Sequence, residues 1–191
     1  MLLAAKQDRK RYTGEMAKTT SQSITTAILR DIETRLGRPP RGLEGVALFS
    51  PSGEPMVIKV ASLVEGKPFP NLYWLIDPEL VYRIDCEEAG GLIHRLQQRV
   101  DEELELRESM VVDHRAFIEQ RNNFMSEPVK AKLQELDYFQ LLQQRGIGGI
   151  ADFSRIRCLH TWYAAHLIEP NTIGELLDAH WLDIDRVEED A

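Results

Sequence analysis

Residues 46–61 read VALFSPSGEPMVIKVA, and this stretch decides the fold class. Two runs rich in β-branched and other apolar residues, 46–49 and 56–61, flank the turn sequence Ser-Pro-Ser-Gly at 50–53. A pair of such runs across a Pro/Gly turn predicts an antiparallel hairpin. After a second turn sequence, residues 72–76 (LYWLI) predict a third strand, which brings the sheet to about the minimum size for independent stability.

Helical patterns lie on both sides of this sheet in the sequence. Residues 21–36 carry an apolar residue every three or four positions and are followed by Gly37, which predicts a short amphipathic helix. Asp77 followed by Pro78 predicts the start of another helix, since Asp caps helices and Pro suits the first turn. We therefore expect an α+β fold, in which a small antiparallel sheet of about three strands is packed by helices.

The most periodic segment is predicted to be one long helix over about 92–124. Four apolar residues fall seven positions apart there, at Leu104, Val111, Ile118 and Met125. A new helix start at residues 126–128 then predicts a long antiparallel helical hairpin over about 92–145. Heptad-spaced apolar residues pack within a chain or join two chains, so a homodimer or a protein partner bound through the hairpin stays open.

Length and charge set the domain organisation. The 191 residues, 43% hydrophobic and 28% charged, fit one domain, which we expect at 21–182. It is flanked by a flexible basic N-terminal arm at 1–20 and an acidic C-terminal tail at 183–191. The net charge of -8 divides into +5 for residues 1–41 and -13 for the remainder. An acidic body makes nucleic acid an unlikely partner, because each phosphate contact needs a cationic side chain.

The sequence predicts a cytoplasmic protein with no membrane association. No apolar run approaches the roughly 20 residues that a bilayer requires. The N-terminal charges follow a short apolar stretch, an order that does not fit a signal peptide. The two cysteines, Cys86 and Cys158, do not form a CxxC pair, so we expect reduced thiols.

A glycine-rich segment supplies the candidate binding site. Residues 145–154 read RGIGGIADFS and lead into a helix expected from about Arg155, so that free N–H groups and Arg155 and Arg157 in the first turn would attract an anion. A purely structural alternative is that Gly146 ends the preceding helix and Asp152 or Ser154 caps the next one. The candidate anion-binding residues are Lys67, Gly148, Gly149, Arg155, Arg157 and His160.

Cys158, His160 and His166 raise the question of a metal or a nucleophile. On a helix, residues two apart face different directions, so Cys158 and His160 are not expected to converge. Zinc would need ligands from elsewhere, such as Cys86, His94 or His180. The sequence therefore predicts no metal site and no cofactor, and His160 is the one candidate catalytic residue.

Three separated segments carry a family resemblance. They are GKPFPNLYWL at 66–75, RCLH at 157–160 followed by His166, and NTIG at 171–174. Together they resemble domain-of-unknown-function family 501, an uncharacterised bacterial family, over roughly 38–177. The resemblance implies a fold unit and no established activity. Members of that family carry cysteines near 49–53 and after the third strand, whereas this chain has none at those positions.

Two functions from different classes fit these patterns. The first is a noncatalytic binding or adaptor protein, with a small anionic-ligand pocket or a protein-interaction role. The second is a small enzyme acting on an anionic, phosphorylated metabolite, in which Arg155 and Arg157 hold the anion and His160 is the acid or base. Because the sequence carries no catalytic signature, it favours the noncatalytic function. A cavity that joins Lys67, Arg157 and His160 would favour ligand binding.

Overall fold

A computed structural model describes residues 24–189 of the chain and contains the predicted sheet. Its strand order is β1-β2-β5, with both neighbouring pairs antiparallel. A short two-stranded hairpin, β3–β4, lies between β2 and β5 in the sequence. The strands are β1 (Leu43–Phe49), β2 (Pro55–Val60), β3 (Leu63–Val64), β4 (Lys67–Pro68) and β5 (Tyr73–Leu75).

Helices make up most of the remaining described chain, and with the sheet they confirm the α+β class. The first precedes the sheet and the others follow it. They are α2 (Thr26–Leu36), α3 (Pro78–Ala89), α4 (Leu92–Glu102), α5 (Leu104–Phe124), α6 (Glu127–Glu135), α7 (Phe139–Gln143), α8 (Leu159–His166) and α9 (Thr172–Glu189), with a 3-10 turn, η1 (Ile147–Gly149), before α8.

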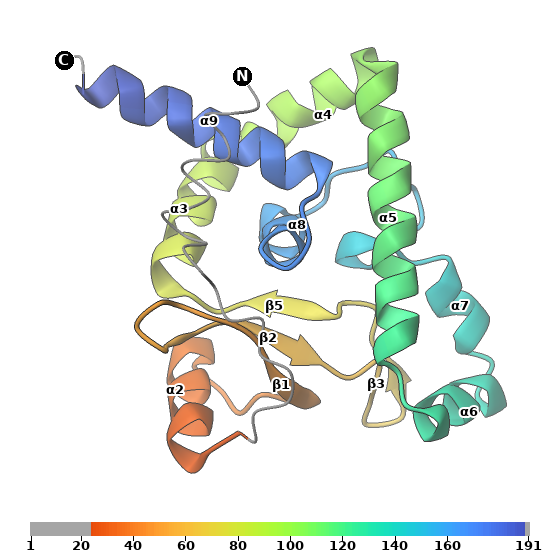
Figure 1. Ribbon diagram of the computed structural model, residues 1–191. Helices are drawn as coiled ribbons and strands as arrows, with labels where there is room; N and C mark the ends of the chain where they lie inside the picture. The colour runs from red at the N-terminus through yellow and green to blue at the C-terminus, as the bar shows by residue number, and fades with distance from the viewer. Residues whose placement is uncertain (1–23, 190–191) are drawn as a thin grey trace.

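Helices α2 and α8 lie on opposite sides of the sheet (Figure 1). On one face, Ile58 of β2 packs with Ile32 of α2 in a small cluster. On the other face, Val57 joins the main core with Leu159 and Trp162 of α8. Successive side chains of a strand point to opposite faces, so the alternation along β2 places α2 below the sheet and α8 above it.

The helix predicted over 92–124 is two helices. Glu103 has extended backbone angles (φ -100°, ψ 104°), which end α4 and begin α5. Carbonyl groups left without helical partners at this break are bound by a side chain, since Arg107 donates to the carbonyl oxygens of Val100 and Asp101 at 3.3 and 2.6 Å. The four heptad-spaced residues begin at Leu104, after the break, so their spacing gave no sign of it.

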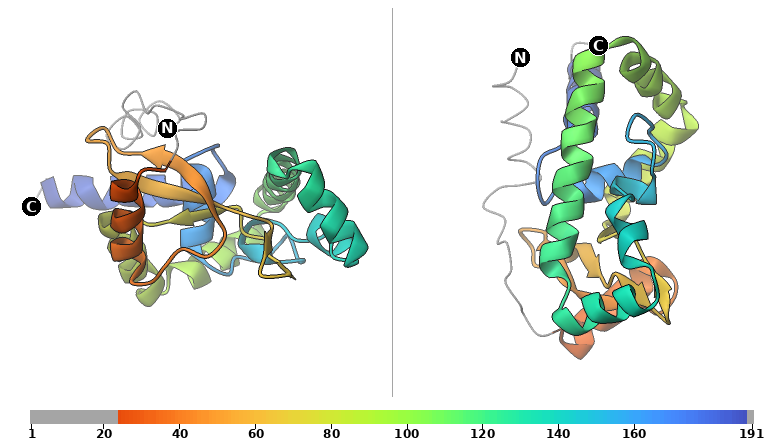
Figure 2. Two further views of the ribbon diagram at one scale, coloured as in Figure 1. Left: turned by 90° about the horizontal axis from the view of Figure 1, so that it is seen from below. Right: turned by 90° about the vertical axis from the view of Figure 1, so that its right-hand side faces the viewer.

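The return of the hairpin is made by two short helices: α6 lies across the C-terminal end of α5, and α7 turns back beside α5 (Figure 2). Asn122 of α5 and Gln143 after the hairpin turn exchange two amide hydrogen bonds of 2.8 and 2.9 Å. Arg121, which is fully buried, donates to the carbonyl oxygens of Pro70 and Leu142. These contacts fix the hairpin to the segment before β5.

Most of the heptad stripe packs inside the chain. Of its four residues, Ile118 and Met125 are buried and Val111 is half-buried, whereas Leu104 is 62% exposed. The stripe is therefore mainly a core element of this chain. A homodimer or protein partner on the hairpin stays a prediction.

The C-terminal helix extends beyond the expected end of the domain. The acidic segment expected as a tail from residue 183 is helical as far as Glu189, and Asp185 lies 3.1 Å from Arg83 of α3. The basic arm expected at 1–20 lies outside the described residues. None of the helices within 24–189 combines the length and the apolar character that a membrane crossing requires.

Candidate functional site

The glycine-rich turn before α8 is held in place by a buried histidine. The His114 Nδ1 atom accepts a 3.0 Å hydrogen bond from the Ile147 N–H group, and its ring stacks on Phe153 at 4.6 Å. Gly148 and Gly149 have positive φ angles of 72° and 69°, which favour glycine. A side chain at Gly149 would also approach the Pro70 ring to 2.8 Å. The turn therefore depends on glycine for both its backbone angles and its close packing.

The helix expected from about Arg155 begins later, at Leu159. The intervening loop is held by other bonds, since Asp152 accepts from the Ser154 and Arg155 N–H groups and Gln97 accepts from the Ile156 N–H group. Arg155 and Arg157 thus lie in this loop and not in a first helical turn. The prediction that free backbone N–H groups and a helix dipole bind the anion is wrong for this segment, because its N–H groups at 154–156 are already bonded.

The same loop nevertheless forms a depression with several arginines. Its volume is about 510 Å³, within the range of small-molecule sites. Arg155 and Arg157 contribute from the loop, and Arg145 contributes from the short segment between α7 and η1. The lining residues are Gln97, Arg145, Gly149, Ile150, Ala151, Asp152, Arg155, Ile156 and Arg157.

The charge balance of this depression is positive. Three guanidinium groups and one carboxylate line it, a sum of +2 on a chain whose net charge is -8. The carboxylate, Asp152, accepts hydrogen bonds from the Ser154 N–H and hydroxyl groups at 3.0 and 2.7 Å, and these bonds lower its pKa. Arg155 forms an ion pair of 3.7 Å with Asp101, which is outside the lining, and the Arg155 side chain remains 57% exposed.

The structure brings together only some of the six residues predicted to bind an anion. Gly149, Arg155 and Arg157 line the depression, and Gly148 adjoins Thr161 instead. Lys67 is exposed in β4 and is not among the lining residues, and neither is His160. Arg145 was not among the residues predicted to bind the anion. Its position directly before Gly-Ile-Gly-Gly could have indicated it.

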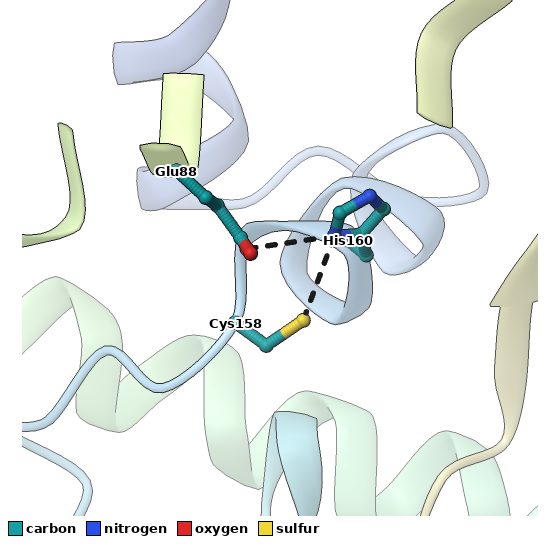
Figure 3. Close-up of side chains that lie close together, drawn as sticks. All are labelled: Glu88, Cys158 and His160. Carbon is teal, nitrogen blue, oxygen red and sulfur yellow. Dashed lines mark hydrogen bonds and ion pairs between the residues drawn. The ribbon is translucent and has the colours of Figure 1, made fainter. Parts of the chain in front are cut away.

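A second cluster forms beside the start of α8 (Figure 3). The Cys158 Sγ atom lies 3.8 Å from His160 Nδ1, and the Glu88 Oε1 atom of α3 lies 3.4 Å from the same nitrogen. The three ligand atoms are all within 4.8 Å of one another. Their side chains are half-buried, so the cluster contacts solvent at one side.

The surroundings of His160 favour its protonated form. The hydrogen bond with Cys158 is the largest influence, and with the nearby Glu88 and the Val81 carbonyl it raises the pKa of His160 to about 9, against the opposing effect of burial. His160 Nε2 faces the Val81 carbonyl oxygen at 3.3 Å and the Asp85 carboxylate at 3.4 Å. The imidazole is therefore contacted by acceptors on both nitrogens.

The prediction that Cys158 and His160 diverge is wrong. Because α8 begins at Leu159, Cys158 is the extended residue before the helix, and its side chain turns back toward His160. Helical angular spacing does not apply across a helix start.

The third member of the cluster, Glu88, was missed. Its signal was available in part: Leu80, Ile84 and Glu88 are four apart, and the first two are buried, so a carboxylate continues the inward stripe of α3. The other proposed ligands do not join the cluster. Cys86 and His94 are exposed, and His180 pairs with Glu87 at 2.9 Å.

His166 has a structural role in the packing of α9. Its Nδ1 atom accepts from the Asn171 N–H group at 3.1 Å, and Nε2 lies 3.0 Å from Asp178. Asn171 also caps α9, because its Oδ1 atom accepts from the Gly174 N–H group at 2.9 Å. These bonds join His166 to the 171–174 segment, so two of the places that carry the family resemblance are in contact.

Comparison with known proteins identifies a family but no individual relative. No curated protein and no solved structure matches the chain. One family model, described as "Protein of unknown function (DUF501)", matches residues 46–179, which is 134 of the 191 residues. The match includes most of the sheet, the loop that carries Arg155 and Arg157, and the cluster of Glu88, Cys158 and His160. The chain therefore belongs to the DUF501 family.

Proposed function

We propose that the protein is a noncatalytic binding protein that takes up a small anionic ligand, such as a phosphorylated metabolite, in the depression at residues 145–157. The observation that carries this proposal is the convergence of Arg145, Arg155 and Arg157 on one depression of an otherwise acidic chain. Guanidinium groups match phosphate and carboxylate oxygens with paired hydrogen bonds, which are stronger than neutral ones.

The lining supports binding more than chemistry. Its residues include no histidine, cysteine, serine or lysine that could act as a nucleophile or a base. Its one carboxylate, Asp152, is occupied by the Ser154 hydrogen bonds. The alternative enzyme would need His160 beside the bound anion, and His160 instead faces α3 through Val81 and Asp85.

The proposal also includes a cytoplasmic location and a protein-interaction role, both predicted from the sequence. A cytoplasmic setting agrees with the two free cysteines, Cys86 and Cys158. A protein-interaction role would use the hairpin, where Leu104 and Val112 are exposed. The anion-binding test below separates ligand binding from that second role.

Isothermal titration calorimetry with inorganic pyrophosphate tests the proposal. A charge-assisted hydrogen bond contributes about 1.5–3 kcal/mol, so Arg157→Ala should weaken binding by about 10- to 100-fold. Arg115→Ala is the matched control, because Arg115 is an exposed arginine of α5 outside the depression. Absence of saturable binding by the unmodified chain, or equal weakening by both substitutions, would contradict a specific site.

A further inference from the structure

We propose that Glu88, Cys158 and His160 bind a single Zn²⁺ ion, with a fourth coordination position open to water or to an added ligand. The site is separate from the anion depression, whose lining contains none of the three residues. The zinc proposal therefore does not depend on the proposed anion-binding function. The α3 helix supplies the carboxylate, and the start of α8 supplies the thiol and the imidazole (Figure 3).

Two of the three separations between the ligand atoms match tetrahedral zinc, and the third, from Cys158 Sγ to Glu88 Oε1, is within 4.8 Å. At the usual zinc bond lengths, a tetrahedral site places a sulfur about 3.6 Å and an oxygen about 3.4 Å from a nitrogen ligand. The observed separations from His160 Nδ1 are 3.8 Å to Cys158 Sγ and 3.4 Å to Glu88 Oε1. Sulfur, imidazole nitrogen and carboxylate oxygen are also the donor types that zinc accepts in proteins.

The hydrogen bonds around the cluster orient its members as they do in metal sites. The Glu88 carboxylate accepts a 2.6 Å bond from the Leu159 N–H group, which fixes it against the start of α8. The Nε2 side of His160 faces the Val81 carbonyl oxygen at 3.3 Å. Zinc-binding histidines usually donate their second N–H group to such an oxygen, and zinc-binding carboxylates are themselves hydrogen-bonded.

A metal ion would also give the three ligand atoms one common partner. Both the Cys158 sulfur and the Glu88 oxygen approach one nitrogen, His160 Nδ1, which carries at most one proton. Asp85 places a further carboxylate 3.4 Å from the opposite nitrogen of the same ring. A divalent cation in place of the Nδ1 proton would contact all three ligand atoms and offset the surrounding negative charge.

Metal titration of the full chain, reduced and first dialysed against chelator, tests the site. Zn²⁺ should bind with one-to-one stoichiometry, and Co²⁺ should give a thiolate-to-metal charge-transfer band. Loss of a residue that only supports a ligand weakens zinc sites by about 10- to 100-fold, so Cys158→Ser should weaken binding by more than that and remove the band. Cys86→Ser is the control, because that cysteine is exposed on α3 outside the cluster; its affinity and spectrum should be unchanged.

Two further measurements test the zinc site even if the Cys158→Ser variant does not fold. Glu88→Gln keeps an oxygen acceptor for the Leu159 N–H group, so this variant should remain folded. It should nevertheless bind zinc less tightly than the unmodified chain. X-ray absorption of the zinc-loaded, unmodified chain should show one sulfur neighbour with nitrogen and oxygen neighbours. A shell without sulfur, no one-to-one binding, or a Cys158→Ser variant with undiminished affinity would overturn the proposal.

Discussion

Lowering the pH from 7 to 4 should destabilise the protein through His114, the residue that holds the glycine-rich turn. His114 is fully buried on α5, and burial lowers its pKa from 6.5 to about 4. Its neutral Nδ1 atom accepts the Ile147 N–H bond, and its ring stacks on Phe153 and contacts the Trp162 ring at a tilt of 60°. Protonation would remove that acceptor and place an uncompensated charge in the core.

The magnitude follows from the two pKa values. The folded pKa is depressed, so the unfolded chain binds more protons between pH 6.5 and about 4. The contribution to stability is complete above pH 6.5 and is lost as the pH falls through the folded value. A difference of about 2.5 in pKa, at about 1.4 kcal/mol for each unit, amounts to about 3 kcal/mol.

Urea unfolding at a series of pH values measures this loss, and His114→Asn is the matched variant. The asparagine oxygen can accept the Ile147 N–H bond but does not titrate in this range. The variant should be less stable at pH 7, because it leaves part of the imidazole volume unfilled, and its stability should fall less steeply below pH 6.5. Equal pH slopes for the two proteins would refute the assignment to His114.

Two substitutions test the packing of α9 against α8 and of α5 in the core. Gly174→Ala should cost about 1–3 kcal/mol of stability by urea unfolding, because the added methyl group would overlap the His166 ring, whereas Gly45→Ala has open space and should be nearly neutral; equal effects would argue against the tight contact. Ile118→Asp should cost several kcal/mol, since Ile118 is 8% exposed and its replacement would bury an unpaired charge; unchanged unfolding would show that this part of α5 is not packed.

The sheet was predictable because its information is local. The runs 46–49 and 56–61 and the turn between them contain the β-branched pattern and the Pro/Gly pair that specify a hairpin. The helix break at Glu103 was not predictable in the same way. The heptad-spaced residues begin only after it, at Leu104, and the Arg107 side chain that satisfies the break reaches back to carbonyl groups six and seven residues away.

The site was predictable only in part, because its residues come from distant segments. The loop contributed Arg155 and Arg157, as expected from their place after the glycines. The start of α8 was misplaced because Arg155 and Ile156 suit a helix as well as a loop, and the Gln97 side chain, 59 residues away from Ile156, decides between them. Glu88 reaches Leu159 across 71 residues, a pairing that no local pattern encodes.

Arginine side-chain NMR during a pyrophosphate titration tests the central claim most directly, because it reports each guanidinium separately. The Nε–H resonances of Arg145, Arg155 and Arg157 should shift together and saturate with one dissociation constant. Those of Arg95 and Arg115, which lie outside the depression, should not move. Unchanged resonances for the three lining arginines, or equal shifts across all five, would contradict an anion site in the loop before α8.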